Sequence, residues 1–238
     1  MSAVADAGLM PTADEITILL LSLRIAALAV VVALPFALLA AMALARPYFR
    51  GKLLLDTFVH LPLLLPPVLT GYVLLVLFGR QGAIGQWLES WFGLTFAFRW
   101  TGAVIAAAVM AFPLFVRAIR LSIEAIPHEI HEMALSLGAG PWTRFRRVVL
   151  PLSLPGIAAG MALAFAKALG EFGATITFVS NIPGETRTLA LAMHSLMQVP
   201  EGEAGIGRLA IVSVVLAVGA LLVSEWMVRR STFRRSGH

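Results

Sequence analysis

Five long apolar segments constrain this chain more than any other feature of its sequence. They cover residues 16–45, 54–78, 101–121, 156–179 and 206–228. A helix needs about 20 apolar residues to cross a hydrocarbon core about 30 Å thick, and each segment is long enough. Because lipid offers the backbone no hydrogen bonds, such segments cross membranes as helices. The sequence therefore predicts an all-α polytopic membrane protein with about five transmembrane helices, forming one domain over residues 1–238.

Composition agrees with this prediction and excludes several other classes of protein. Hydrophobic residues make up 59% of the chain, charged residues make up 13%, and the mean hydropathy is +0.90. Cysteine is absent, which excludes a disulfide framework, thiol catalysis and a cysteine metal site. The sequence also lacks the glycine-rich P-loop that holds ATP phosphates and any histidine pair with the spacing of zinc ligands. We therefore expect no metal site and no catalytic site in this chain.

The positive residues indicate the orientation of the chain in the membrane, and they do not indicate a nucleic-acid partner. With five spans, one side holds Arg46, Arg50, Lys52, Arg117, Arg120, Arg144, Arg146, Arg147, Arg229, Arg230, Arg234 and Arg235. The other side holds Arg80, Arg99, Arg187 and Arg208. Since cytoplasmic loops are enriched in Lys and Arg, we expect the 122–155 loop and the C-terminus in the cytoplasm and the N-terminus outside.

The 122–155 loop has the pattern of two short helices joined by a turn. Pro127 can begin the first helix, while Gly138 and Gly140 can supply left-handed geometry at its end and Pro141 prevents its continuation. Its apolar stripe is Ile130, Met133, Ala134 and Leu137. We expect the second helix to stop at Pro151. A helix-turn-helix that projects from the membrane into solvent is a shape that another protein can bind.

This loop resembles the EAA motif of bacterial ABC-importer permeases, which reads Glu-Ala-Ala, three residues, Gly, nine residues and Ile-x-Leu-Pro. The matching positions are Glu132, Ala134, Gly138, Leu150 and Pro151. Met133 replaces the first Ala, and Val148 replaces Ile. The resemblance implies that these five matching residues form a coupling site, through which the loop docks into a groove of a cytoplasmic ABC ATPase.

Three further segments are similar to the permeases of molybdate ABC importers. They are residues 60–72, 112–120 and 170–188, and the likeness extends over roughly residues 16–230. It implies the type I ABC-importer permease fold in the bacterial inner membrane, with two permease copies forming the path. It also implies cytoplasmic ATPase subunits that bind ATP and magnesium, and a periplasmic or lipid-anchored protein that delivers the oxyanion. This chain would then need no cofactor of its own. Tungstate or sulfate stays open as the substrate, and so does transport or catalysis without an ATPase.

Some residues at membrane depth are candidates for the translocation path. They are Lys167, Glu171, Gly170, Gly173 and Thr175. Lys167 and Glu171 are spaced i, i+4 and can form a structural ion pair, or Lys167 can add positive potential to an anion path. The two glycines can loosen the helix between them.

Three other patterns concern helix shape and the outer side. The cluster of Pro62, Pro66, Pro67 and Gly71 should distort the second span. A stripe of small residues, Gly156, Gly160, Ala164 and Ala168, suits close packing either within the chain or between copies. Aromatic residues within 80–100 are typical of interfacial anchors. Residues 181–205, with a short helix expected near 188–198, can either receive a soluble binding protein or serve as a solvated connector.

Overall fold

The computed structural model describes residues 12–200 and 202–233, and all regular structure in these ranges is helical. The elements are α1 (Ala13–Leu44), α2 (Lys52–Leu64), α3 (Pro67–Phe78), α4 (Ala83–Phe92), α5 (Trp100–Glu124), α6 (His128–Ser136), α7 (Pro141–Arg144), a π-helix η1 (Phe145–Val149), α8 (Leu150–Leu169), α9 (Gly173–Val179), α10 (Leu189–Leu196) and α11 (Glu203–Phe233). The predicted all-α class is confirmed.

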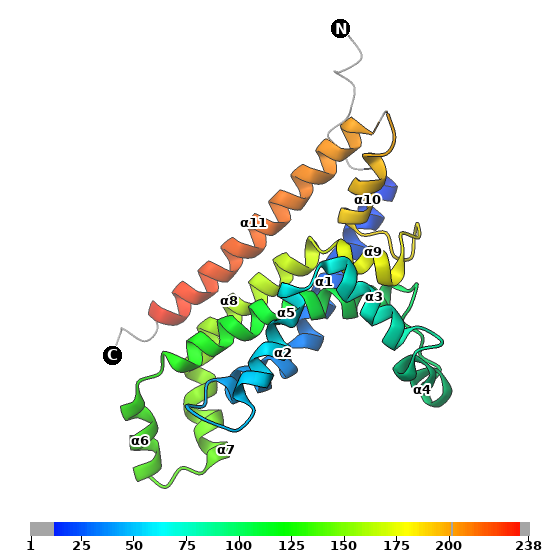
Figure 1. The fold of residues 1–238 in the computed structure, drawn as a ribbon. Coiled ribbons are helices and arrows are strands. Elements are labelled where there is room, and N and C mark those ends of the chain that lie inside the picture. The colour runs from blue at the N-terminus through cyan, green and yellow to red at the C-terminus, as the bar shows by residue number, and fades with distance from the viewer. Residues whose placement is uncertain (1–11, 201, 234–238) are drawn as a thin grey trace.

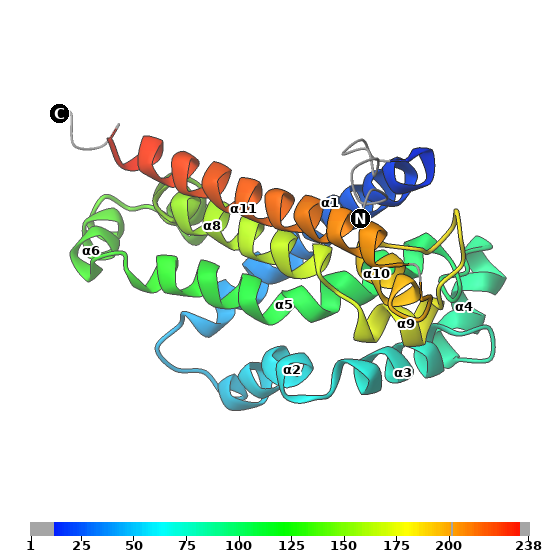
Figure 2. The same cartoon turned by 90° about the horizontal axis from the view of Figure 1, so that it is seen from above.

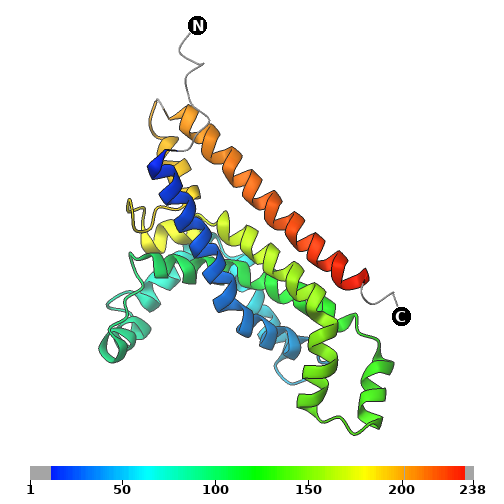
Figure 3. The ribbon, with the colours of Figure 1, turned by 180° about the vertical axis from the view of Figure 1, so that it is seen from behind.

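The long helices run between two ends of the molecule. Helices α6 and α7 lie at one end, and α4, α9 and α10 lie at the other, while α11 runs beside α8 (Figures 1 and 2). The 122–155 loop and the segments expected on the outer side therefore lie at opposite ends, as the charge pattern predicts. Figure 3 shows α6 and the start of the α7–α8 helix projecting side by side beyond the bundle.

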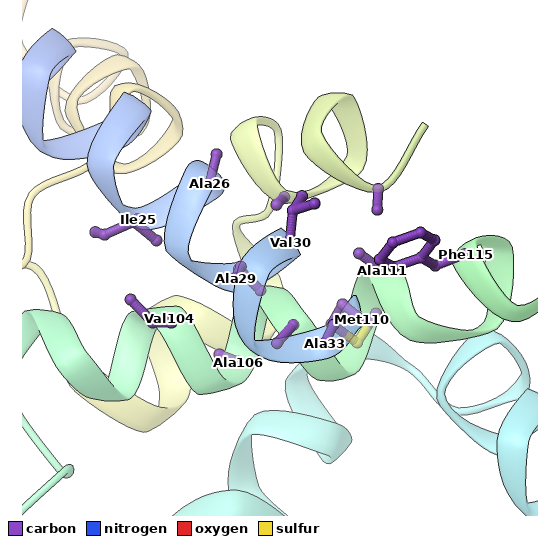
Figure 4. Close-up of a cluster of buried hydrophobic side chains, with 14 of the residues drawn as sticks. Ile25, Ala26, Ala29, Val30, Ala33, Val104, Ala106, Met110, Ala111 and Phe115 are labelled. Carbon is purple, nitrogen blue, oxygen red and sulfur yellow. The ribbon is translucent and has the colours of Figure 1, made fainter. Parts of the chain in front are cut away.

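The core lies where α1, α5 and α8 pack together. Small side chains from α1 interleave with α5 residues, and Phe115 is among the largest buried groups (Figure 4). A Cβ added to Gly156 would lie 2.1 Å from Ser122 Cβ, and one added to Gly160 would lie 2.9 Å from Phe115 Cδ2. The small-residue stripe on α8 thus brings α8 close to α5, which is packing within the chain.

Within the described residues, three continuous helical stretches are long and apolar enough to cross a membrane alone: Ala13–Leu44, Trp100–Glu124 and Pro141–Leu169. A fourth crossing results if α2 and α3 are counted as one broken span. Helix α11 contains a shorter apolar stretch, Gly205–Ala220, within its full length. These elements correspond in order to the five predicted spans.

The predicted span at 54–78 is wrong as a single helix, because α2 and α3 meet at an angle of 113°. Leu65 and Pro66 each precede a proline, and both have extended backbones with ψ of 143° and 133°. A following proline ring disfavours the helical conformation, so the helix stops at Leu64. Pro67 then occupies the first position of α3, where its missing N–H costs nothing. The expected distortion of this span is confirmed, and it is large enough to break the helix completely.

The predicted span at 156–179 is also divided, since α8 ends at Leu169 and α9 begins at Gly173. On the other side the helix begins earlier than predicted, because α7, η1 and α8 form one continuous stretch from Pro141. The expectation that Pro151 stops the second short helix is therefore wrong. A π turn directly precedes it, in which the Leu150 N–H donates to the Phe145 carbonyl five residues back. The wider turn gives the proline ring room, so the helix continues.

Candidate coupling loop and translocation path

The first helix of the loop ends as the glycine spacing predicts. The Ala139 N–H donates to the Ala134 carbonyl at 3.0 Å, and the Gly138 N–H donates to the Leu135 carbonyl at 2.9 Å. This pair of bonds is a Schellman motif, and Gly138 has the left-handed φ of +73° that it requires. A Cβ on Gly138 would meet nothing within 4 Å, so glycine is needed here for its backbone and not for space. Gly140 has an ordinary φ of −64°.

The apolar stripe of α6 divides between an inner and an outer face. Ala134 is 8% exposed and faces the rest of the loop, while Met133 is 58% and Leu137 is 87% exposed. We call α6 the first arm of the loop and the helical stretch that begins at Pro141 its second arm. Trp142, on the second arm, is also exposed, and its ring lies 5.5 Å from that of Phe145. The loop therefore has an uncovered apolar tip, which is the pattern of a surface that a protein partner covers.

The remaining coupling candidates differ in their surroundings. Glu132 is an exposed residue, and its Oε1 lies 3.3 Å from Nδ1 of the exposed His128. Leu150 and Pro151 are half-buried at the start of α8. The structure thus brings Glu132, Ala134 and Gly138 together on the first arm and places Leu150 and Pro151 at the foot of the second. The contact between His128 and Glu132 has no signal in the sequence beyond the i, i+4 spacing of the two residues.

Lys167 and Glu171 form the ion pair that their spacing allows. Lys167 Nζ donates to Glu171 Oε2 at 2.6 Å, and Glu171 is 3% exposed while the Lys167 side chain is 31% exposed. The second carboxylate oxygen, Oε1, accepts the Ala174 N–H at 3.0 Å. A carboxylate at a helix N-terminus is favourable because it binds free N–H groups there. Glu171 therefore joins the end of α8 to the start of α9.

The other path candidates lie where α3 and α9 cross. A Cβ added to Gly173 would lie 2.6 Å from Pro67 Cβ, and Thr175 is buried. On the facing helix, a Cβ added to Gly71 would lie 2.4 Å from the Ala174 carbonyl oxygen. These residues hold two backbones in close contact. Gly71 is expected from the sequence to help distort the second span, and the structure shows that it also lets α3 approach the backbone of α9.

Gly170 differs from the buried candidates because it reaches a cavity. This cavity of about 510 Å³ lies between α8, α10 and α11, and Phe172 and His194 also line it. The two rings are 4.8 Å apart. Lys167 and Gly170 are thus the more exposed path candidates within one chain, whereas Glu171 and Thr175 are buried and Gly173 packs against Pro67.

Comparison with known proteins places these features in one group. The sequence profile described as binding-protein-dependent transport system inner membrane component matches residues 33–234. The molybdenum transport system permease protein ModB of Escherichia coli (strain K12) is 57% identical over 223 residues, covering 94% of this chain and 97% of that protein. ModB of Haemophilus influenzae is 52% identical over 216 residues, covering 91% of this chain and 94% of that protein.

The fold also matches that of a solved transporter. A chain in the crystal structure of a bacterial alginate ABC transporter, in complex with an alginate pentasaccharide-bound periplasmic protein, superposes with a TM-score of 0.73. The match covers 93% of this chain and 81% of that chain, at 19% sequence identity. At this identity the likeness concerns the fold alone.

Proposed function

Because the chain belongs to the family of binding-protein-dependent transport system inner membrane components, we propose that it is the permease of an ATP-driven importer that moves molybdate across the bacterial cytoplasmic membrane. The observation that carries the substrate assignment is the 57% identity to a molybdenum permease over nearly the whole chain. The permease itself does no bond chemistry, and ATP and magnesium are bound by the partner.

Two copies of the chain form the membrane path, and their 122–155 loops face the cytoplasm. The N-terminus then lies outside, and a periplasmic or lipid-anchored protein delivers the oxyanion at the end formed by α4, α9 and α10. The Lys and Arg distribution and the opposite placement of the two sets of loops support this orientation.

The loop transmits force because it is a rigid extension of the bundle. Its second arm continues without interruption into α8, and α8 is in backbone contact with α5, from which the first arm leaves. The exposed tip around Met133, Leu137 and Trp142 enters the groove of the ATPase, and Glu132 bonds its rim. When the ATPase dimer binds ATP and closes, it then moves α5 and α8 together and opens the path to the outside.

The two helix breaks mark the path. Irregular backbone at membrane depth is tolerated only where it is buried in protein or lines a watery cavity. The breaks at 65–66 and 170–172 adjoin each other, since Gly173 packs against Pro67. Because Glu171 is already paired and caps α9, the region holds few free charges, which suits an anion that must leave as easily as it enters.

Uptake by the purified complex in proteoliposomes tests the proposal against its alternatives. We expect ATP-dependent uptake of radiolabelled molybdate when the ATPase and the binding protein are present. Unlabelled sulfate in large excess should leave this uptake unchanged, and competition by tungstate measures how far the complete complex distinguishes molybdate from tungstate. Uptake that sulfate abolishes would assign a different oxyanion, and uptake without the ATPase would make the chain a secondary transporter.

A further inference from the structure

Helix α2 has little buried surface that could fix its position. Among its residues only Val59 is buried, while Leu53, Leu54 and Leu64 each expose most of their side chains. It lies along α5 (Figure 1). Polar contacts with α5 therefore matter more for α2 than they do for the tightly packed helices.

An ion-pair cluster joins α2 to the last turns of α5. Arg120 Nη1 donates to Asp56 Oδ1 at 3.3 Å, and Arg120 Nε donates to Glu124 Oε1 at 2.8 Å. His60 Nδ1 lies 3.4 Å from the same Asp56 oxygen. The guanidinium is thus held by one carboxylate on its own helix and by one on α2. The planar fork of an arginine suits such a bridge, because its donors point in fixed directions.

The cluster lies between two parts of the proposed machinery. Glu124 is the last residue of α5, and α6 begins at His128, so Arg120 is close to the start of the 122–155 loop, here called the docking loop. Asp56 is on the helix that leads to the break at 65–66. The ion pair therefore connects the loop to the broken span across 64 residues of sequence.

We propose that Asp56 and Arg120 are positioning residues that pass movement of the docking loop to the broken span α2–α3. When the ATPase pulls the end of α5, Arg120 moves Asp56 and α2 with it. The angle between α2 and α3 at the break then changes, and α3 is reoriented. This inference rests on the proposed function, since it assumes that the loop is moved by an ATPase.

The experiment measures molybdate transported per ATP hydrolysed by reconstituted complexes of Asp56→Asn, Arg120→Gln and the double variant. Arg117→Gln is the matched control, because Arg117 is an exposed arginine one turn earlier on α5. Asp56→Glu keeps the charge and serves as the conservative variant. Size-exclusion chromatography and ATP hydrolysis establish that each complex assembles.

We expect both single variants to assemble and hydrolyse ATP, with transport per ATP reduced about threefold or more. The double variant should be no worse than either single one, and Asp56→Glu and Arg117→Gln should stay near wild type. A merely stabilising pair would lower the yield of complex and leave the ratio unchanged, which would overturn the inference. Losses that multiply in the double variant would overturn it too. A wild-type complex without ATP-driven transport would overturn the proposed function and this inference with it.

Discussion

Replacing Gly138 should weaken ATPase docking by an amount that follows from its backbone. At φ +73° a residue with a Cβ is strained, and the open space around this position leaves no other cost. The strain is about 1 kcal/mol for Ala and about 2 kcal/mol for the β-branched Val. The loop relieves it by giving up the Schellman turn, which tilts α6 relative to the second arm.

That strain converts directly into a loss of affinity. If only the native turn binds, the apparent dissociation constant of the ATPase rises by the reciprocal of the fraction that keeps the turn. We therefore expect binding to weaken by up to about fivefold for Gly138→Ala and up to about thirtyfold for Gly138→Val, the full factors being reached if the wild-type turn has no stability to spare. Asn tolerates left-handed backbone, so Gly138→Asn should stay close to wild type.

Titration of detergent-solubilised permease with purified ATPase measures these constants. The matched control is Gly140→Ser, because Gly140 lies two residues away with φ −64° and serines are favoured where it caps α7. Wild-type affinity for Gly138→Val would refute the reasoning. An equal loss for Gly140→Ser would also refute it, since the effect would then not depend on the left-handed turn.

Three other predictions concern the ion pair, the helix contacts and the orientation. Lys167→Met should lower the free energy of unfolding by about 3 kcal/mol, because the buried Glu171 loses its ion-pair partner. The double variant Lys167→Met/Glu171→Gln should lose less, and additive losses in a thermal unfolding series would reject the pairing. Gly71→Ala should destabilise by about 1–3 kcal/mol through its collision with α9, whereas Gly219→Ala, with open space around it, should be neutral or stabilising; equal unfolding temperatures would contradict the close approach. A single cysteine at Gly140 should react with impermeant maleimide only from the cytoplasmic side, and labelling from outside in sealed cells would reverse the orientation. The related positions 6 and 235, which would report the two termini, lie outside the described residues.

How far the sequence predicts this structure depends on the range of the forces involved. Hydropathy is a sum over many residues, so the places of α1, α5 and α11 follow from it closely. The turn at Gly138 and the break after Leu64 are also local, since a glycine or a proline determines each one.

Other features need contacts that the sequence does not reveal. The break before α9 involves a hydrogen bond from the Ala174 N–H to the Glu171 carboxylate, and the helix continues through Pro151 because a π turn precedes it. The Asp56–Arg120 pair joins residues 64 positions apart, and a single sequence has no signal for that distance. Path residues are predicted from charge and flexibility, whereas the structure shows that Glu171 caps α9 and that Gly173 packs against Pro67.

Simultaneous measurement of molybdate uptake and ATP hydrolysis in proteoliposomes tests the central claim most directly. The compared samples are the wild-type complex, the permease without its ATPase, and the complex with Glu132→Ala. We predict uptake only when the permease, the ATPase and ATP are all present, and fewer molybdate ions per ATP for Glu132→Ala because the exposed carboxylate no longer bonds the groove. Equal uptake with and without the ATPase, or a wild-type ratio for Glu132→Ala, would contradict the account of an ATP-coupled permease that works through this loop.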